Sequence, residues 1–111
     1  MRRQGHVTFQ NDPVGVHARG FTGVDKFMWG SDYPHDEGTH PYTTESLRRS
    51  FAGTDPAELQ QLFAGNAAHV YDFDLDALAP IAARVGPTVD EVAEPLDTVP
   101  PDSNSPAFTR Q

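Results

Sequence analysis

Residues 27–35, which read FMWGSDYPH, decide the fold of this chain. The run from Lys26 to Gly30 is short, apolar and bounded by glycine, which is typical of a fully buried strand. In α/β folds, side chains just past the carboxyl end of a strand face the ligand crevice. Asp32 follows the predicted strand 26–30 and is therefore a candidate site residue, although an aspartate here also commonly caps a turn.

The segments on either side of this stretch predict a mixed α/β order. β-forming residues predict an earlier strand over residues 6–10, and three glycines in residues 14–24 favour a loop or a short irregular helical turn. Residues 31–42 contain two prolines and a glycine and predict an irregular loop. Several helices are expected after it.

Local signals place the ends of these helices. Asp55 and the proline after it are typical of a helix start. Gly65 is expected to end that helix and Asn66 to cap the next one. From residue 95 onward, four prolines and little apolar content predict a disordered tail, 95–111, which leaves 1–94 as the structured part.

Composition excludes several classes of function. The 111 residues include 8 Lys+Arg against 16 Asp+Glu, a net charge of −8, so a nucleic-acid or anionic-membrane surface is disfavoured. The length allows one domain at most. There is no apolar run long enough to span a membrane and no cysteine, so a cytoplasmic protein is the default expectation.

The helices carry more apolar surface than two strands can cover. Leu59, Leu62 and Phe63 line one helix face, and a two-stranded sheet is too small to be stable alone. One interpretation is that the chain is part of a larger fold. The alternative is a small acidic interaction protein without catalysis, whose exposed helix faces dock on a partner.

The loop after the second strand is rich in metal-binding side chains, all within nine residues. They are Asp32, His35, Asp36, Glu37 and His40. Their spacing matches no zinc or calcium template, so solvated loop polarity accounts for most of them.

Three motifs in order resemble one family. FQNDP at residues 9–13, MWGSDYPH at 28–35 and GNAA at 65–68 resemble the C-terminal end of the amidohydrolase-related family, in the branch that includes aminocarboxymuconate semialdehyde decarboxylase. The resemblance covers about residues 3–94. It implies a (β/α)8 TIM barrel, of which 6–10 and 26–30 would be strands seven and eight.

The resemblance also implies roles for three residues. Asp32 matches the aspartate that binds the divalent metal, usually Zn²⁺, and helps activate water. His35 matches a histidine near the mouth of the site, a candidate for substrate binding, and Asn66 matches a structural asparagine. The implied activity is metal-dependent hydrolysis of a small molecule, or decarboxylation of a small carboxylic acid by a carboxy-lyase.

Most of such a site is missing from this sequence. It contains no His-x-His pair, and a catalytic zinc needs three or more protein ligands. The sequence therefore predicts an incomplete barrel that is inactive alone and binds no metal tightly. A fragment, or one half of a split enzyme whose other strands come from a separate chain, would both fit.

Overall fold

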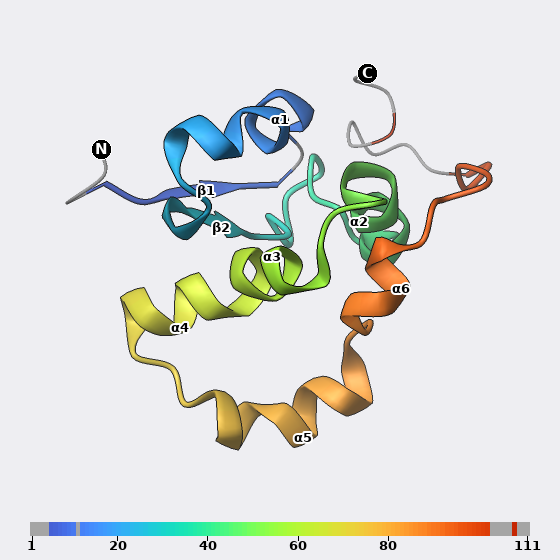
Figure 1. Ribbon diagram of the computed structural model, residues 1–111. Helices are drawn as coiled ribbons and strands as arrows, with labels where there is room; N and C mark the ends of the chain where they lie inside the picture. Colours follow the sequence, from blue (N-terminus) through green and yellow to red (C-terminus); the bar gives the residue numbers. More distant parts are fainter. Residues whose placement is uncertain (1–4, 11, 103–107, 109–111) are drawn as a thin grey trace.

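The computed structural model describes residues 5–10, 12–102 and 108 (Figure 1). Two short strands are followed by a series of helices. In chain order the elements are β1 (Val7–Phe9), α1 (Pro13–Thr22), the 3₁₀ turn η1 (Val24–Lys26), β2 (Phe27–Trp29), α2 (Thr43–Phe51), α3 (Pro56–Gln60), the π-helical η2 (Gln61–Gly65), α4 (Asn66–Tyr71), α5 (Leu75–Val85) and α6 (Val89–Ala93).

The strands β1 and β2 pair in parallel, and both lie within the ranges expected from the sequence. Val7 pairs with Phe27 and Phe9 with Trp29. Because parallel neighbours cannot be joined by a tight turn, the chain must cross over between them. The crossover is α1, which lies above the strands in Figure 1, while α3 and α4 lie below them.

Helix α1 corrects the prediction of a loop or irregular turn over residues 14–24. The Asp12 side chain caps it by accepting a hydrogen bond from the Gly15 amide at 2.8 Å, and a proline occupies its first turn. Val16 is buried in the core. Capping and packing of the crossover therefore outweigh the low helix propensity of its glycines.

The core lies between one face of the strand pair and the helices. Alternate residues of a strand point to opposite faces. The odd-numbered residues Val7, Phe9, Phe27 and Trp29 all belong to the core or pack against it, whereas Thr8 is exposed. The Phe9 and Phe27 rings meet edge to face at a centroid distance of 5.8 Å. On the opposite face of the pair Thr8 is exposed, while its register partner Met28 is 4% exposed, so that face is only partly open.

Asn66 does not cap a new helix, which corrects the expectation of a break at Gly65. Gly65 and Asn66 both have helical backbone angles, with φ of −60° and −66°, so α3, η2 and α4 follow one another without a break. A π-helical stretch occupies the place where the sequence signals a stop. Asn66 is 5% exposed, and its side chain bonds elsewhere in the fold.

The apolar stripe at the α3–η2 junction is part of the core and is not an exposed docking face. Leu59 is fully buried and Leu62 is 2% exposed. A row of exposed apolar side chains lies instead on α5, which Figure 1 shows at the bottom of the molecule. They are Leu75, Leu78, Ile81 and Val85.

The C-terminal segment has two described parts. Residues 95–102 contain no helix or strand. Phe108 is 7% exposed and packs against the Tyr42 ring. The predicted disorder of residues 103–107 and 109–111 falls outside the described residues.

Candidate active site at the carboxyl ends of the strands

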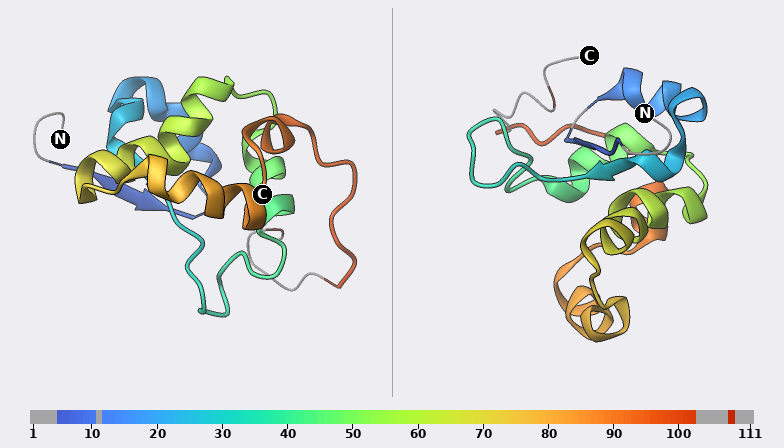
Figure 2. Two further views of the ribbon diagram at one scale, coloured as in Figure 1. Left: turned by 90° about the horizontal axis from the view of Figure 1, so that it is seen from below. Right: turned by 90° about the vertical axis from the view of Figure 1, so that its left-hand side faces the viewer.

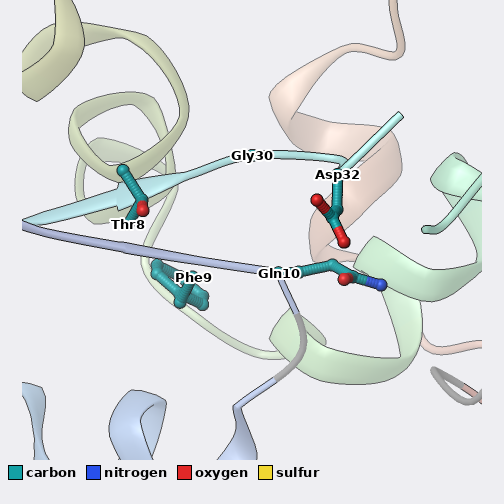
Figure 3. A pocket seen from close by; sticks show the side chains of 5 residues that line it. All are labelled: Thr8, Phe9, Gln10, Gly30 and Asp32. Carbon is teal, nitrogen blue, oxygen red and sulfur yellow. The ribbon is translucent and has the colours of Figure 1, made fainter. Parts of the chain in front are cut away.

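A pocket of about 290 Å³ opens at the carboxyl ends of the two strands (Figure 3). Its lining residues come from β1 and from the residues that follow β1 and β2: Thr8, Phe9, Gln10, Gly30 and Asp32. The volume is slightly below the roughly 300–1,000 Å³ typical of small-molecule sites. The two strands form only one side of the pocket wall, whereas a closed sheet would surround the pocket.

Strand pairing brings Gln10 and Asp32 together, although they are 22 positions apart in the sequence. The Gly30 amide donates to the Phe9 carbonyl at 2.9 Å and extends the ladder past the end of β2. The Trp29 indole N–H donates to the Gln10 carbonyl at 3.0 Å. Figure 3 shows the Asp32 carboxylate directed toward the side of the pocket where Gln10 lies.

Asp32 has a left-handed backbone and an imidazole partner. Its φ is 58°, a conformation that residues with a side chain seldom adopt outside turns and functional sites. His35 Nδ1 lies 2.9 Å from Asp32 Oδ1, and the His35 amide also donates to the Asp32 carbonyl. The Asp32 side chain is 43% exposed and that of His35 76%. The sequence placed both residues at this site, and the structure brings them into contact.

The loop after Asp32 folds closely on itself. A Cβ atom at Gly38 would lie 2.9 Å from the His35 carbonyl oxygen and 3.0 Å from that of Asp32, so only glycine fits this backbone approach. The Thr39 amide donates to the Ser31 carbonyl at 3.0 Å, and Thr39 is fully buried. These contacts fix the loop around Asp32.

Gln10 and Thr8 are site residues that the sequence did not single out. The Gln10 side-chain amide donates to the Glu37 carbonyl and so joins the end of β1 to the loop. Thr8 is exposed on the face of β1 opposite Phe9. The period-2 alternation of the strand could have marked Thr8 and Gln10, since both face the side opposite Phe9.

A metal centre does not fit the described residues of this chain. No group of three or more His, Asp or Glu side chains comes together within the described ranges. Asp32 and His35 form a pair, and Asp36, Glu37 and His40 do not join them. A catalytic zinc needs at least three protein ligands, so this pair is too few.

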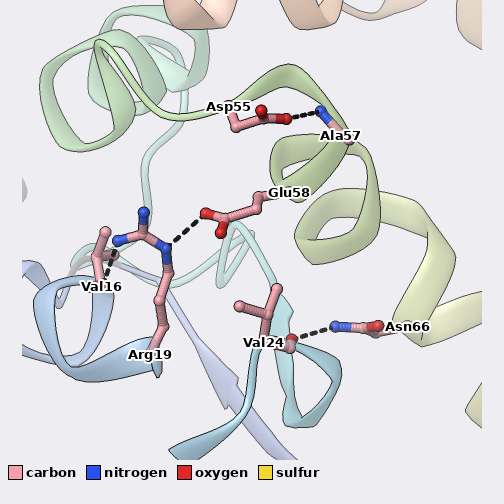
Figure 4. A network of polar contacts seen from close by, with 7 residues as sticks. All are labelled: Val16, Arg19, Val24, Asp55, Ala57, Glu58 and Asn66. Carbon is pink, nitrogen blue, oxygen red and sulfur yellow. Dashed lines mark hydrogen bonds and ion pairs between the residues drawn. The ribbon is translucent and has the colours of Figure 1, made fainter. Parts of the chain in front are cut away.

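Asn66 lies away from this pocket, at the beginning of β2 (Figure 4). Its side-chain amide donates to the carbonyl oxygens of Val24 at 2.7 Å and Phe27 at 2.6 Å. Nearby, Arg19 forms a 2.8 Å ion pair with Glu58, which joins α1 to α3. The three residues selected from the sequence thus occupy two places: Asp32 lines the pocket with His35 in contact with it, and Asn66 lies at the helix–strand junction.

Comparison with known proteins identifies the family. The family model described as amidohydrolase matches residues 5–73, which is more than half of the chain and includes both strands and the pocket. The chain belongs to the amidohydrolase family, and this membership supports an amidohydrolase-type function and a TIM-barrel-like α/β fold, with which the parallel pair is consistent. No curated protein and no solved structure gave a significant match.

None of the described helices combines the length and the apolar character needed to cross a bilayer.

Proposed function

We propose that this chain forms the closing end of an amidohydrolase (β/α)8 barrel, in which β1 and β2 are the last two strands. The observation that carries the proposal is the placement of Thr8, Gln10 and Asp32 around one pocket at the carboxyl ends of a parallel pair. In (β/α)8 barrels, active sites are built at this end of the strands. The remaining strands would come from an earlier coding segment or from a separate chain.

The proposed activity of the completed barrel is metal-dependent hydrolysis of a small molecule. Decarboxylation of a small carboxylic acid, as in the aminocarboxymuconate semialdehyde decarboxylase-like branch, is the variant reaction. Further metal ligands, with zinc the expected ion, would have to come from the other strands, because no three His, Asp or Glu side chains of the described residues come together here. This chain alone is therefore proposed to be inactive.

Within this proposal Asp32 acts as the proton acceptor. The His35 contact involves Oδ1, and Oδ2 has no such contact with His35, so that oxygen can receive a proton from an attacking water. His35 is a positioning residue, since its ring holds the carboxylate in one orientation. Its 76% exposed side chain is also free to contact a substrate at the mouth.

A chimera tests the role of Asp32. Residues 1–94 would replace the matching end of a complete amidohydrolase, and turnover would be measured for Asp32→Asn and Asp36→Asn. Both substitutions remove one carboxylate charge from the same exposed loop. We expect Asp32→Asn to lose at least ~10²-fold in turnover, the lower end of a general-base contribution. The turnover of Asp36→Asn should stay close to that of the parent chimera. Near-normal turnover in Asp32→Asn would contradict the proposal.

The coding sequence upstream provides a second, simpler test. A preceding or neighbouring reading frame that encodes a barrel with a His-x-His pair supports a divided amidohydrolase. Its absence favours the second candidate, a small interaction protein. The observation behind that candidate is the apolar face of α5, where Leu78 is 43% and Ile81 48% exposed.

A further inference from the structure

The C-terminal segment contacts the residue at which the site loop ends. The Tyr42 hydroxyl donates a hydrogen bond to the Asp102 carboxylate. The Phe108 ring packs against the Tyr42 ring with a centroid distance of 6.4 Å and an interplanar angle of 75°. Figure 2 shows loop 31–42 and residues 95–102 on the same side of the molecule in both of its views.

Phe108 is held from two directions. Tyr42 precedes the first turn of α2, and Arg49 lies in its last turn. The Arg49 guanidinium carbon is 5.9 Å from the centre of the Phe108 ring, within the range of a cation–π contact. With 7% of its surface exposed, Phe108 is one of the buried apolar residues of the chain. A residue so placed fixes Tyr42 relative to α2.

A short series of hydrogen bonds connects Tyr42 to the candidate site. The Tyr42 amide donates to the Thr39 carbonyl at 2.8 Å, and the Thr39 amide donates to the Ser31 carbonyl at 3.0 Å. Thr39 is fully buried, and its hydroxyl lies 2.9 Å from that of Thr43 in α2. Ser31 immediately precedes Asp32. A movement of Tyr42 would therefore be passed through one buried threonine to the backbone beside Asp32.

We infer that Asp102 and Phe108 anchor the loop that carries Asp32 and His35. The C-terminal segment is then a positioning element of the candidate site, and its loss opens the loop before the core unfolds. A purely structural role makes a different prediction. If Phe108 only covers apolar surface on α2, its removal lowers the stability of the loop and of the core together.

Limited proteolysis with a glutamate-specific protease separates these two roles. Cleavage after Glu37 requires the loop to open, because Gly38 is buried. Cleavage after Glu58 requires the core to open, because Leu59 beside it is fully buried. The measured quantity is the ratio of the initial rate after Glu37 to that after Glu58, in the full chain under native conditions.

Phe108→Ala is expected to raise this ratio severalfold, and Asp102→Asn to raise it less. Phe108→Tyr keeps the ring and should restore the parent ratio. The matched control is Phe21→Ala, since Phe21 is 88% exposed and lies in α1. If the ratio of cleavage after Glu37 to cleavage after Glu58 is unchanged in Phe108→Ala, the inference is wrong. This holds if both cleavage rates rise together, and equally if the loop is already open in the parent protein. The readout needs no enzymatic activity, so its failure leaves the proposed function standing.

Discussion

The Asn66 side-chain amide lies 2.6 Å from the carbonyl oxygen of Phe27, the first residue of β2. The same amide group also donates to Val24 in the turn before the strand. One buried side chain therefore joins the start of α4 to the start of the strand that leads to Asp32. Because Asn66 acts here as a donor within a helix, its role differs from that of a helix cap.

Substitution of Asn66 tests this donor role. Asn66→Ala leaves two carbonyl oxygens without their partner, and we expect a loss of about 2–3 kcal/mol in the free energy of unfolding. Asn66→Asp is the diagnostic variant. Aspartate is a good helix cap, so a capping role would tolerate it, whereas a carboxylate facing two carbonyl oxygens is repelled. Chemical denaturation of both variants gives the answer, and near-parent stability of Asn66→Asp would contradict the donor role.

Unpaired strand edges and exposed apolar side chains predict that the isolated chain is only marginally stable. In the described residues, β1 and β2 pair only with each other, so both outer edges of the sheet lack a neighbouring strand. The apolar face of α5 is exposed as well. We expect the purified chain to aggregate or to bind a dye specific for exposed apolar surface, with a broad thermal transition. A sharp cooperative transition from a monomer would contradict this prediction.

Zinc binding by the isolated chain should be weak. Asp32 and His35 supply one carboxylate and one imidazole on exposed side chains, and tight binding needs more ligands held in fixed geometry. Calorimetry should therefore show no stoichiometric binding at sub-micromolar concentrations. His6→Ala, outside the loop, is the control. Sub-micromolar binding of one Zn²⁺ that disappears in Asp32→Ala would show that a metal site forms.

Tyr42 should ionise at higher pH than an ordinary tyrosine. The hydrogen bond to Asp102 raises the pKa of Tyr42, and partial burial and the charges of Asp102 and Glu45 raise it further. A raised pKa in the folded state means that this contribution to stability is present below the unfolded pKa of about 10 and is lost as the pH rises through the folded value. Ultraviolet absorbance titration should show a late-ionising tyrosine that is absent in Tyr42→Phe.

The Asp102 contact can be checked in the same titration. Asp102→Asn removes the carboxylate that is the main cause of the shift, so the pKa of Tyr42 should fall toward its usual range. Asp97→Asn, in the same described segment, serves as the control. A late-ionising tyrosine that persists unchanged in Asp102→Asn would show that the hydroxyl has another partner.

Short-range signals allowed several elements to be predicted from the sequence alone. The Asp55 carboxylate accepts from the Ala57 amide at 2.7 Å and begins α3 as its sequence indicates. Apolar β-forming residues and a following glycine likewise predicted β2. In each case the residues that determine the structure are within a few positions of one another, so local patterns carry the information.

Contacts between distant segments decided the features of the fold and of the site that local patterns did not predict. Glycines made residues 14–24 look like a loop, but a parallel pair requires a crossover, and that crossover is α1. The glycine before Asn66 suggested a helix break, but Asn66 lies inside a helix, and its side chain bonds to the first residue of β2, 39 positions away, and to the turn before that strand. Gln10 and Asp32 line one pocket only because β1 and β2 pair. The sequence by itself determined which side chains could do chemistry, and tertiary pairing decided which of them meet, because contacts between residues far apart in the chain leave no local pattern.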